Sequence, residues 1–351
     1  MITSIVRLPW LKLRPPHFRL CPLSRGGLRS DRKVRAIFRW ALLFSISLLS
    51  VEGRPVLAAT APEPTTSLAP GMVGIFYPPP KGRQDVVLVL GGSEGGTQGS
   101  GPLAKLLAEH GLGALALAYF GAPGLSPTLE NVPLESLEAG VGWLRARPGM
   151  GSRRIAVLGV SKGAEAALLL ASHDRRVCAV VAGVPSSVVW AGMDLAHPEK
   201  PVTASSWTLA GKPLPFVPYA EGPFQGVREL YDRSLAKASP EAAIRVERIK
   251  GPVLLISGKA DQLWPSNPMS NAVMARLDAH HFAFPHRHLT YDDAGHAAVG
   301  PPLASNSPNL PRLAALGGSP AGNQAARSDG WPKVLTFFDD AFAGKTCGSV
   351  R

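Results

Sequence analysis

The feature of this sequence that most restricts its fold is a series of short apolar runs separated by longer amphipathic segments. Most runs are almost continuously Val, Leu, Ile or Ala, as expected of strands buried on both faces of a sheet. The predicted strands are Val73–Tyr77, Val86–Leu90, Ala114–Tyr119, Ile155–Val160, Val177–Val184, Val253–Ser257 and His288–Tyr291. The predicted helices are Pro102–Glu109, Leu134–Ala146, Lys162–His173, Asn267–Ala279 and Asp329–Phe342. This alternation predicts an α/β domain with a mostly parallel, doubly wound sheet and helices on both faces.

Two segments interrupt the alternation. Pro185–Arg248 is rich in Pro, Ser and Gly with weak periodicity, and Gly300–Arg327 has the composition of a long loop. Unstructured loops of this length are usually functional or mobile. In an open α/β sheet they would lie near the carboxyl ends of the strands, where ligands bind.

The net charge of +12 resides mainly at one end of the chain. Residues 1–58 hold 11 Lys and Arg against 2 Asp and Glu, whereas the remaining 293 residues hold 26 against 23. So small an excess gives no electrostatic footprint for nucleic acid, and no nucleic-acid partner is predicted.

The N-terminal segment has the features of an export signal. The basic stretch Arg29–Arg39 precedes the apolar run Trp40–Val51 and a small-residue exit at Ala58-Ala59, which is typical of a secretory signal peptide. The run is shorter than the roughly 20 residues of a spanning helix, so no stable membrane span is expected in the mature protein. We predict an exported, periplasmic or secreted protein with a leader at 1–59, a linker at 60–70 and one domain at 71–345. An uncleaved N-terminal anchor and a cytoplasmic protein with a misplaced start codon are the alternatives.

Two cysteines follow the leader. Cys178 lies in an apolar strand-like run and Cys347 lies near the C-terminus. A disulfide between them would be permitted in an oxidising compartment. A buried free thiol that packs as a small hydrophobe is the state we predict for Cys178.

Two segments match G-x-S-x-G, the turn that leads a strand into a helix with a serine at its apex. In Gly159–Gly163 the serine is Ser161, and a strand-like run precedes it and a helical run follows. In Gly91–Gly95 the serine is Ser93, but the glycine-rich residues that follow disfavour a helix;. Ser161 is therefore the predicted nucleophile.

The second glycine-rich segment suits a different task. The backbone N–H groups of Gly92, Ser93 and Glu94 follow an early strand and could point at a developing oxyanion. A plain flexible turn is the alternative.

A nucleophilic serine needs a base and an acid that orients the base, and in this chemistry they often follow in the order Ser, Asp, His, each after a strand. Asp261 follows the strand that ends at Ser257, and His296 follows the strand that ends at Tyr291. Asp292 and Asp293 are alternative acids, but they lie too close to His296 along the chain to approach it from the Asp261 side.

A histidine cluster precedes the last predicted strand. Its members are His280, His281, His286 and His288. No carboxylate or cysteine falls at ligand spacing among them, so we predict no metal site, and the predicted chemistry requires no cofactor.

The residues around these motifs resemble one known family. GVSKGAEAALLLAS at 159–172, LALAYFGAPGLSPTLENVPLESLEAGVGWL at 115–144, SGKADQLWPS at 257–266 and DDAGHAAVGPP at 292–302 are similar to the C-terminal catalytic domain shared by acyl-CoA thioesterases and bile acid-CoA:amino acid N-acyltransferases. LVLGGSEGG at 88–96 is similar to the bacterial branch of that family.

The resemblance implies an α/β-hydrolase fold and a catalytic triad at Ser161, Asp261 and His296, with the N–H of Lys162 as an oxyanion donor. The acyltransferases of this family use cysteine where this chain has Ser161, which favours hydrolysis. The implied substrate is an acyl-CoA thioester. Because coenzyme A is cytosolic and the leader predicts export, an exported carboxylesterase, dienelactone-hydrolase-like or peptidase-like, acting on a substrate without coenzyme A is the alternative. An acyltransferase and a non-catalytic binding module are less favoured.

Overall fold

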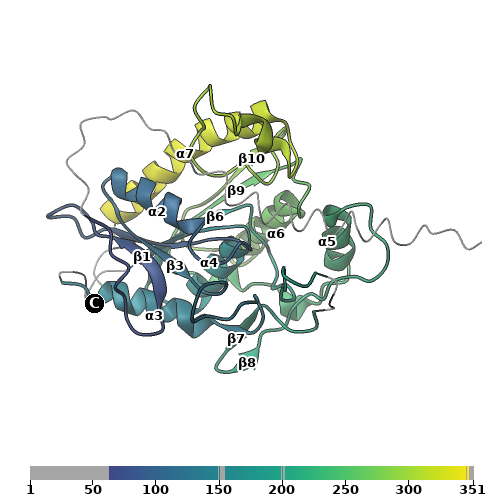
Figure 1. Ribbon diagram of the computed structural model, residues 1–351, viewed down its shortest axis with the longest axis horizontal. Helices are drawn as coiled ribbons and strands as arrows, with labels where there is room; N and C mark the ends of the chain where they lie inside the picture. Colours follow the sequence, from purple (N-terminus) through teal and green to yellow (C-terminus); the bar gives the residue numbers. More distant parts are fainter. Residues whose placement is uncertain are drawn as a thin grey trace, which may run out of the picture.

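The computed structural model describes residues 63–148, 150, 155–198, 200, 202–344 and 346–347 (Figure 1). The predicted leader, residues 1–59, lies outside these residues. Part of the predicted linker is attached to the domain, because Thr65 pairs through two backbone hydrogen bonds of 2.8 Å with Phe76. Leu68 packs against the core.

A seven-stranded sheet forms the centre of the domain, in the order β1-β3-β2-β5-β6-β9-β10. All neighbours are parallel except β1 and β3. The strands are β1 (Val73–Tyr77), β2 (Val86–Leu90), β3 (Gly113–Ala118), β5 (Ile155–Val160), β6 (Val177–Gly183), β9 (Val253–Gly258) and β10 (His286–Tyr291). All seven predicted strands are present, and the predicted α/β class is confirmed.

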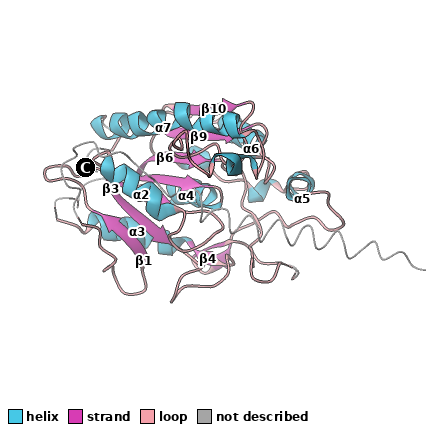
Figure 2. Cartoon of the chain, turned by 45° about the horizontal axis from the view of Figure 1, so that its top comes forward, coloured by secondary structure: helices cyan, strands magenta, loops and turns pink. Residues whose placement is uncertain are grey.

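Helices cover both faces of this sheet (Figure 2). The helices α2 (Ser100–Glu109) and α7 (Pro320–Ala343) pack on one face with Val87 and Val89 of β2. The helices α3 (Leu134–Arg145), α4 (Lys162–His173) and α6 (Ser266–Ala279) pack on the other face with Leu88 and Leu90. Because successive side chains of a strand point to opposite faces, β2 must be apolar throughout. None of the helices within the described residues has the length and hydropathy of a membrane span.

The segment Pro185–Arg248 is more ordered than its composition indicates. It contains β7 (Trp207–Leu209), β8 (Lys212–Pro213), α5 (Val227–Leu235) and the 3-10 helices η1 (Pro240–Ala242) and η2 (Val246–Arg248). The strands β7 and β8 form a small sheet with β4 (Val132–Pro133). Trp190, Tyr231 and Trp264 join edge to face in a buried aromatic cluster. Aromatic packing orders this segment without the periodicity of a long helix or strand.

The prediction of a loop over the whole of Gly300–Arg327 was wrong. The 3-10 helix η3 spans Leu310–Ala314, and α7 already begins at Pro320. Ser319 caps α7, because its side chain accepts a hydrogen bond from the Gly322 N–H. Serine at the N-cap with proline at the first helical position is a start signal for a helix, which the surrounding glycine and proline residues obscured.

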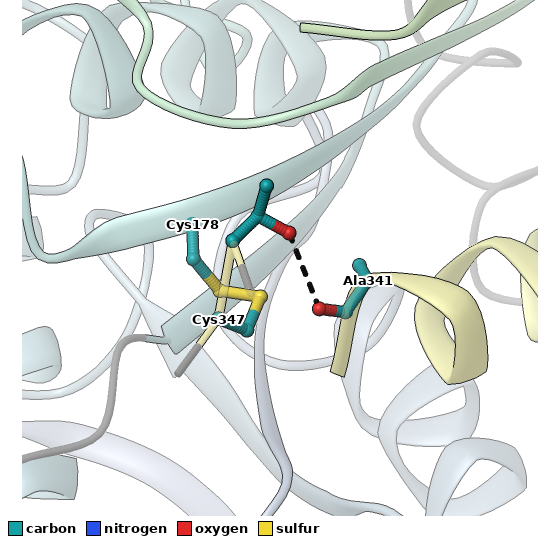
Figure 3. Close-up of a disulfide and its surroundings, with 4 residues drawn as sticks. Cys178, Ala341 and Cys347 are labelled. Atoms are coloured by element: carbon teal, nitrogen blue, oxygen red, sulfur yellow. Dashed lines mark hydrogen bonds between the residues drawn. A yellow bond between two sulfur atoms is a disulfide. The ribbon is translucent and has the colours of Figure 1, made fainter. Parts of the chain in front are cut away.

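The prediction of a free thiol at Cys178 was also wrong. Cys178 on β6 forms a disulfide with Cys347, with their Cα atoms 5.0 Å apart (Figure 3). The helix α7 packs along the sheet and returns the chain end to β6. Just before the cysteine, the Thr346 hydroxyl donates to the Ala341 carbonyl oxygen at 3.3 Å. The pairing follows from this return of the chain, which sequence spacing does not reveal.

Candidate active site

Ser161 occupies a sharp turn between β5 and α4. Its backbone has φ 58° and ψ −123°, a conformation that non-glycine residues rarely adopt;. The flanking glycines are required by close approach, since a Cβ at Gly159 would lie 2.0 Å from the carbonyl oxygen of Gly163. A Cβ at Gly163 would lie 2.3 Å from the carbonyl oxygen of Gly91. The turn therefore lifts the Ser161 hydroxyl above the carboxyl edge of the sheet.

The structure brings Ser161, His296 and Asp261 together in a chain of hydrogen bonds. His296 Nε2 lies 3.0 Å from Ser161 Oγ, and His296 Nδ1 lies 2.9 Å from Asp261 Oδ2. Asp261 follows β9 and His296 follows β10, which are neighbouring parallel strands, so the two loops leave the same edge of the sheet. This arrangement can move a proton from the hydroxyl to the imidazole while the carboxylate orients the ring.

Asp261 is fully buried and its carboxylate is well supplied with donors. Oδ1 accepts hydrogen bonds from the N–H groups of Leu263 at 2.9 Å and Trp264 at 3.3 Å. Oδ2 accepts from the hydroxyl of Ser266 at 2.6 Å in addition to its contact with His296. These donors satisfy the buried carboxylate and fix its orientation toward His296.

The alternative acids point elsewhere. Asp292 is 86% exposed and pairs with Lys259 at 2.7 Å. Asp293 accepts a short hydrogen bond from the Ser319 hydroxyl. Neither carboxylate bonds to His296, so only Asp261 completes the chain among the predicted candidates.

The side chains of the predicted histidine cluster do not converge on a common site, because His286 and His288 contact different partners. His286 contacts the Asp278 carboxylate and the Phe284 carbonyl oxygen, and these partners raise its pKa. His288 contacts the Ser257 hydroxyl at 2.7 Å, and burial lowers its pKa. Over the part of the chain that the structure describes, no three His, Cys, Asp or Glu side chains gather as metal ligands.

The loop that carries His296 is held by residues that sequence reasoning missed. The Asn323 carboxamide oxygen accepts from the Gly295 N–H at 2.9 Å. The Arg327 guanidinium, 3% exposed, donates to the carbonyl oxygens of Ala297 and Val299, and also of Pro301. Burial lowers the pKa of Arg327 to about 10. Both residues belong to the first turns of α7, within the segment Gly300–Arg327 that was predicted as loop.

The glycine-rich loop after β2 lies beside Ser161. Gly92, Ser93 and Glu94 all line the cavity that contains Ser161 and His296. The Gly92 N–H, a predicted oxyanion donor, is occupied, because it donates to Oε1 of the Glu94 side chain at 2.9 Å. Within the described residues, the N–H groups of Ser93 and Lys162 have no protein acceptor. These two groups are the donors left for an oxyanion.

The Glu94 side chain is a second feature that the sequence did not reveal. Burial raises the pKa of its carboxyl, while hydrogen bonds from the N–H groups of Gly92 and Glu94 and the proximity of His296 partly offset that rise. The hydroxyl of Tyr119, in the segment after β3, donates to the Gly91 carbonyl oxygen at 2.6 Å and also reaches the Gly92 carbonyl oxygen at 3.4 Å. The Glu94 carboxylate thus folds back onto the N–H of Gly92 in its own loop and lies near His296, the predicted base.

The side chain of Lys162 points away from the cavity into a buried network. Its Nζ lies 2.5 Å from the Glu165 carboxylate and 2.9 Å from the Ser206 hydroxyl. The other oxygen of Glu165 accepts from the N–H of Trp190 at 3.1 Å and the indole N–H of Trp207 at 2.8 Å. Burial lowers the pKa of Lys162, and the Glu165 charge opposes that effect. The network joins the helix that follows the nucleophile to the small sheet.

The cavity above Ser161 is small and mostly apolar. Its volume is about 130 Å³, well below the roughly 300–1,000 Å³ of pockets for drug-sized ligands. The apolar walls come from Leu103, Val160, Leu263, Val299, Leu313 and Leu316. Such a site can hold a short apolar group against the serine hydroxyl.

Comparison with known proteins agrees with this geometry. Residues 132–344 match the family described as "BAAT / Acyl-CoA thioester hydrolase C terminal". The chain belongs to this family. The chain is 30% identical over 282 residues to acyl-coenzyme A thioesterase 1 of Rattus norvegicus, covering 78% of this chain and 64% of that protein. It is 30% identical over 268 residues to acyl-coenzyme A amino acid N-acyltransferase 1 of Mus musculus, covering 75% and 61%.

The family member described here spans less than two thirds of the length of these relatives. Among solved structures, a puromycin-hydrolyzing peptidase of Mycobacterium tuberculosis superposes with a TM-score of 0.54 at 16% identity. That superposition covers 84% of this chain and 41% of the peptidase. The likeness, together with the parallel sheet and its helices, identifies the α/β-hydrolase fold.

Proposed function

We propose that this protein is a serine acyl hydrolase that works through an acyl-enzyme, with acyl-CoA thioesters as its substrates. The observation that carries the proposal is the chain of hydrogen bonds from Asp261 through His296 to Ser161, placed at the turn between β5 and α4. Family membership and the likeness to the rat thioesterase support the thioester substrate.

The proposed mechanism uses these groups in sequence. His296 takes the proton of Ser161, whose oxygen attacks the substrate carbonyl carbon. The N–H groups of Lys162 and Ser93 hold the oxyanion. The imidazolium, held by Asp261, then gives its proton to the leaving thiolate or alkoxide as the tetrahedral intermediate collapses. A water molecule, deprotonated by the same imidazole, attacks the acyl-serine and releases the acid and the free hydroxyl.

An exported esterase is the second candidate. The Cys178–Cys347 disulfide supports an oxidising compartment;, in agreement with the predicted leader at 1–59. Coenzyme A is cytosolic, so in such a compartment the substrate would be an ester or thioester of another carrier. The triad chemistry is the same in both cases, and only the leaving group differs.

The ratio of kcat/KM for acyl-CoA thioesters to that for aryl esters of the same acyl groups separates the two candidates. A fluorophosphonate probe should label the wild-type enzyme at Ser161, and Ser161→Ala should abolish both labelling and turnover while the circular dichroism spectrum stays unchanged. Substantial turnover by Ser161→Ala would refute the covalent mechanism. A protein that neither reacts with the probe nor hydrolyses any acyl substrate would be a binding module.

A further inference from the structure

We propose that the Glu94 side chain is a positioning residue, which sets the shape of the oxyanion loop by occupying a cradle between Gly91, Gly92 and Gly99. This inference rests on the proposed function. The loop that it concerns spans residues 91–99, between β2 and α2, and supplies the N–H of Ser93 to the site.

The cradle is visible in how closely the glycines approach the carboxylate. A Cβ at Gly91 would lie 2.8 Å from Glu94 Oε1, and a Cβ at Gly92 would lie 2.8 Å from Oε2. A Cβ at Gly99 would lie 1.8 Å from Oε1, and the three atoms nearest to it all belong to Glu94. The space that three side chains would fill is therefore filled by one carboxylate.

The carboxylate also holds the backbone that faces the nucleophile. Oε1 accepts the Gly92 N–H at 2.9 Å, and a Cβ at Gly92 would lie only 3.3 Å from the Cβ of Ser161. Ser93 lies between Gly92, whose N–H is bonded, and Glu94, whose side chain accepts that bond. The N–H of Ser93 itself is free for an oxyanion. A closed turn of three residues thus fixes the direction of this donor.

The loop is held at Gly91 and Gly96 by contacts with the segment after β3. The Gly96 N–H donates to the Phe120 carbonyl oxygen at 2.8 Å, and Tyr119 bonds to the Gly91 carbonyl oxygen. Within residues 92–94, the described structure gives one weaker external contact, from the Tyr119 hydroxyl to the Gly92 carbonyl oxygen at 3.4 Å, and no acceptor outside the loop for the N–H groups. The Glu94 side chain is the closer support of this turn, so its loss should move the oxyanion donor without unfolding the domain.

The first test compares substitutions at Glu94. One oxyanion donor is worth roughly 10²–10³ in kcat, so Glu94→Ala, which loosens the donor without removing it, should lower kcat by roughly tenfold to a hundredfold with little change in KM. Glu94→Gln keeps an acceptor oxygen for the Gly92 N–H and should restore most of kcat. Gln98→Ala, an exposed side chain in the same loop, is the matched control and should keep the wild-type kcat and melting temperature.

The second test displaces the carboxylate without changing it. In Gly99→Ala the new methyl group overlaps Glu94 Oε1 and must push the flexible side chain out of the cradle, so kcat should fall about as far as in Glu94→Ala. In a Glu94→Ala background the cradle is empty, and the further change Gly99→Ala should cost less than about threefold. This non-additivity is the signature of a shared cause.

The results of these tests distinguish failure of the Glu94 positioning role from failure of the proposed acyl-hydrolase function. Additive losses in Glu94→Ala/Gly99→Ala, a normal kcat in Glu94→Ala, or a Glu94→Gln enzyme as slow as Glu94→Ala would each overturn the positioning role, the last because charge would then be responsible. Labelling of Ser161 by fluorophosphonate and wild-type turnover would still stand in all three cases. Absence of both in the wild-type enzyme would instead overturn the proposed function.

Discussion

Replacement of Lys162 by methionine should destabilise the fold strongly through Glu165. The side chains of Lys162 and Glu165 are 2% and 0% exposed, and their charges lie 2.5 Å apart. Methionine fills a similar volume but leaves a buried carboxylate without a countercharge. Breaking a buried pair in this way costs about 3–5 kcal/mol, a large part of the roughly 5–15 kcal/mol by which a domain is stable. At about 2–4 °C per kcal/mol for chains of 150–250 residues, the melting temperature should fall by roughly 6–20 °C.

Urea unfolding followed by tryptophan fluorescence measures this loss, since Trp190 and Trp207 both bond to Glu165. The double variant Lys162→Met/Glu165→Gln removes both charges and should recover at least half of the lost free energy. Lys105→Met is the matched control, because its pair with Glu109 is exposed and 3.9 Å long, and such pairs are worth about 0–1 kcal/mol. A Lys162→Met protein as stable as Lys105→Met, or a double variant no better than Lys162→Met, would refute the reasoning.

Two further predictions concern stability. Cys347→Ser opens a loop closed across 169 residues and should lower the free energy of unfolding by about 2–5 kcal/mol. A reducing agent should destabilise the wild type but not this variant, and equal sensitivity of the two would argue against the disulfide. Burial raises the pKa of Tyr231 from 10.0 to about 12, so the folded state retains this proton more tightly than the unfolded chain. The resulting stability is present below pH 10 and is lost between pH 10 and 12. In alkaline unfolding titrations Tyr231→Phe should reduce that loss by roughly 2–3 kcal/mol, and an unchanged pH dependence would contradict the assignment.

The fold and the three candidate catalytic side chains could be predicted because their signals are local. A strand buried on both faces is apolar at every position, so β2, β5 and β9 are visible in short windows of sequence. Ser161 directly follows β5, and Asp261 and His296 lie in the loops after β9 and the more polar strand β10. Parallel strands end at one edge of a sheet, and this rule alone brings three distant residues to one place.

The sequence was misleading at Cys178 and Arg327 because the state of each residue depends on a partner far along the chain, and at the start of α7 because neighbouring residues obscured a local signal. Cys178 looks like any small residue of a buried strand until α7 returns Cys347 to it. The start of α7 at Pro320 resembles a loop in sequence, because Gly318 and Gly322 lie on either side of the N-cap residue Ser319 and the proline that follows it. Arg327 looks like a surface residue until the loop after His296 supplies carbonyl oxygens to its guanidinium.

The sequence by itself determined the order of the strands along the chain, the turn at Ser161 and the order of the site residues, because backbone sterics and apolar periodicity act over a few residues. Only the tertiary structure decided that the Glu94 carboxylate occupies a glycine cradle beside Ser161, and that the side chain of Lys162 turns away from the site toward Glu165. Those outcomes depend on which groups are packed together once water is excluded. Burial, countercharge and close approach are properties of the assembled fold, and no window of the sequence contains them.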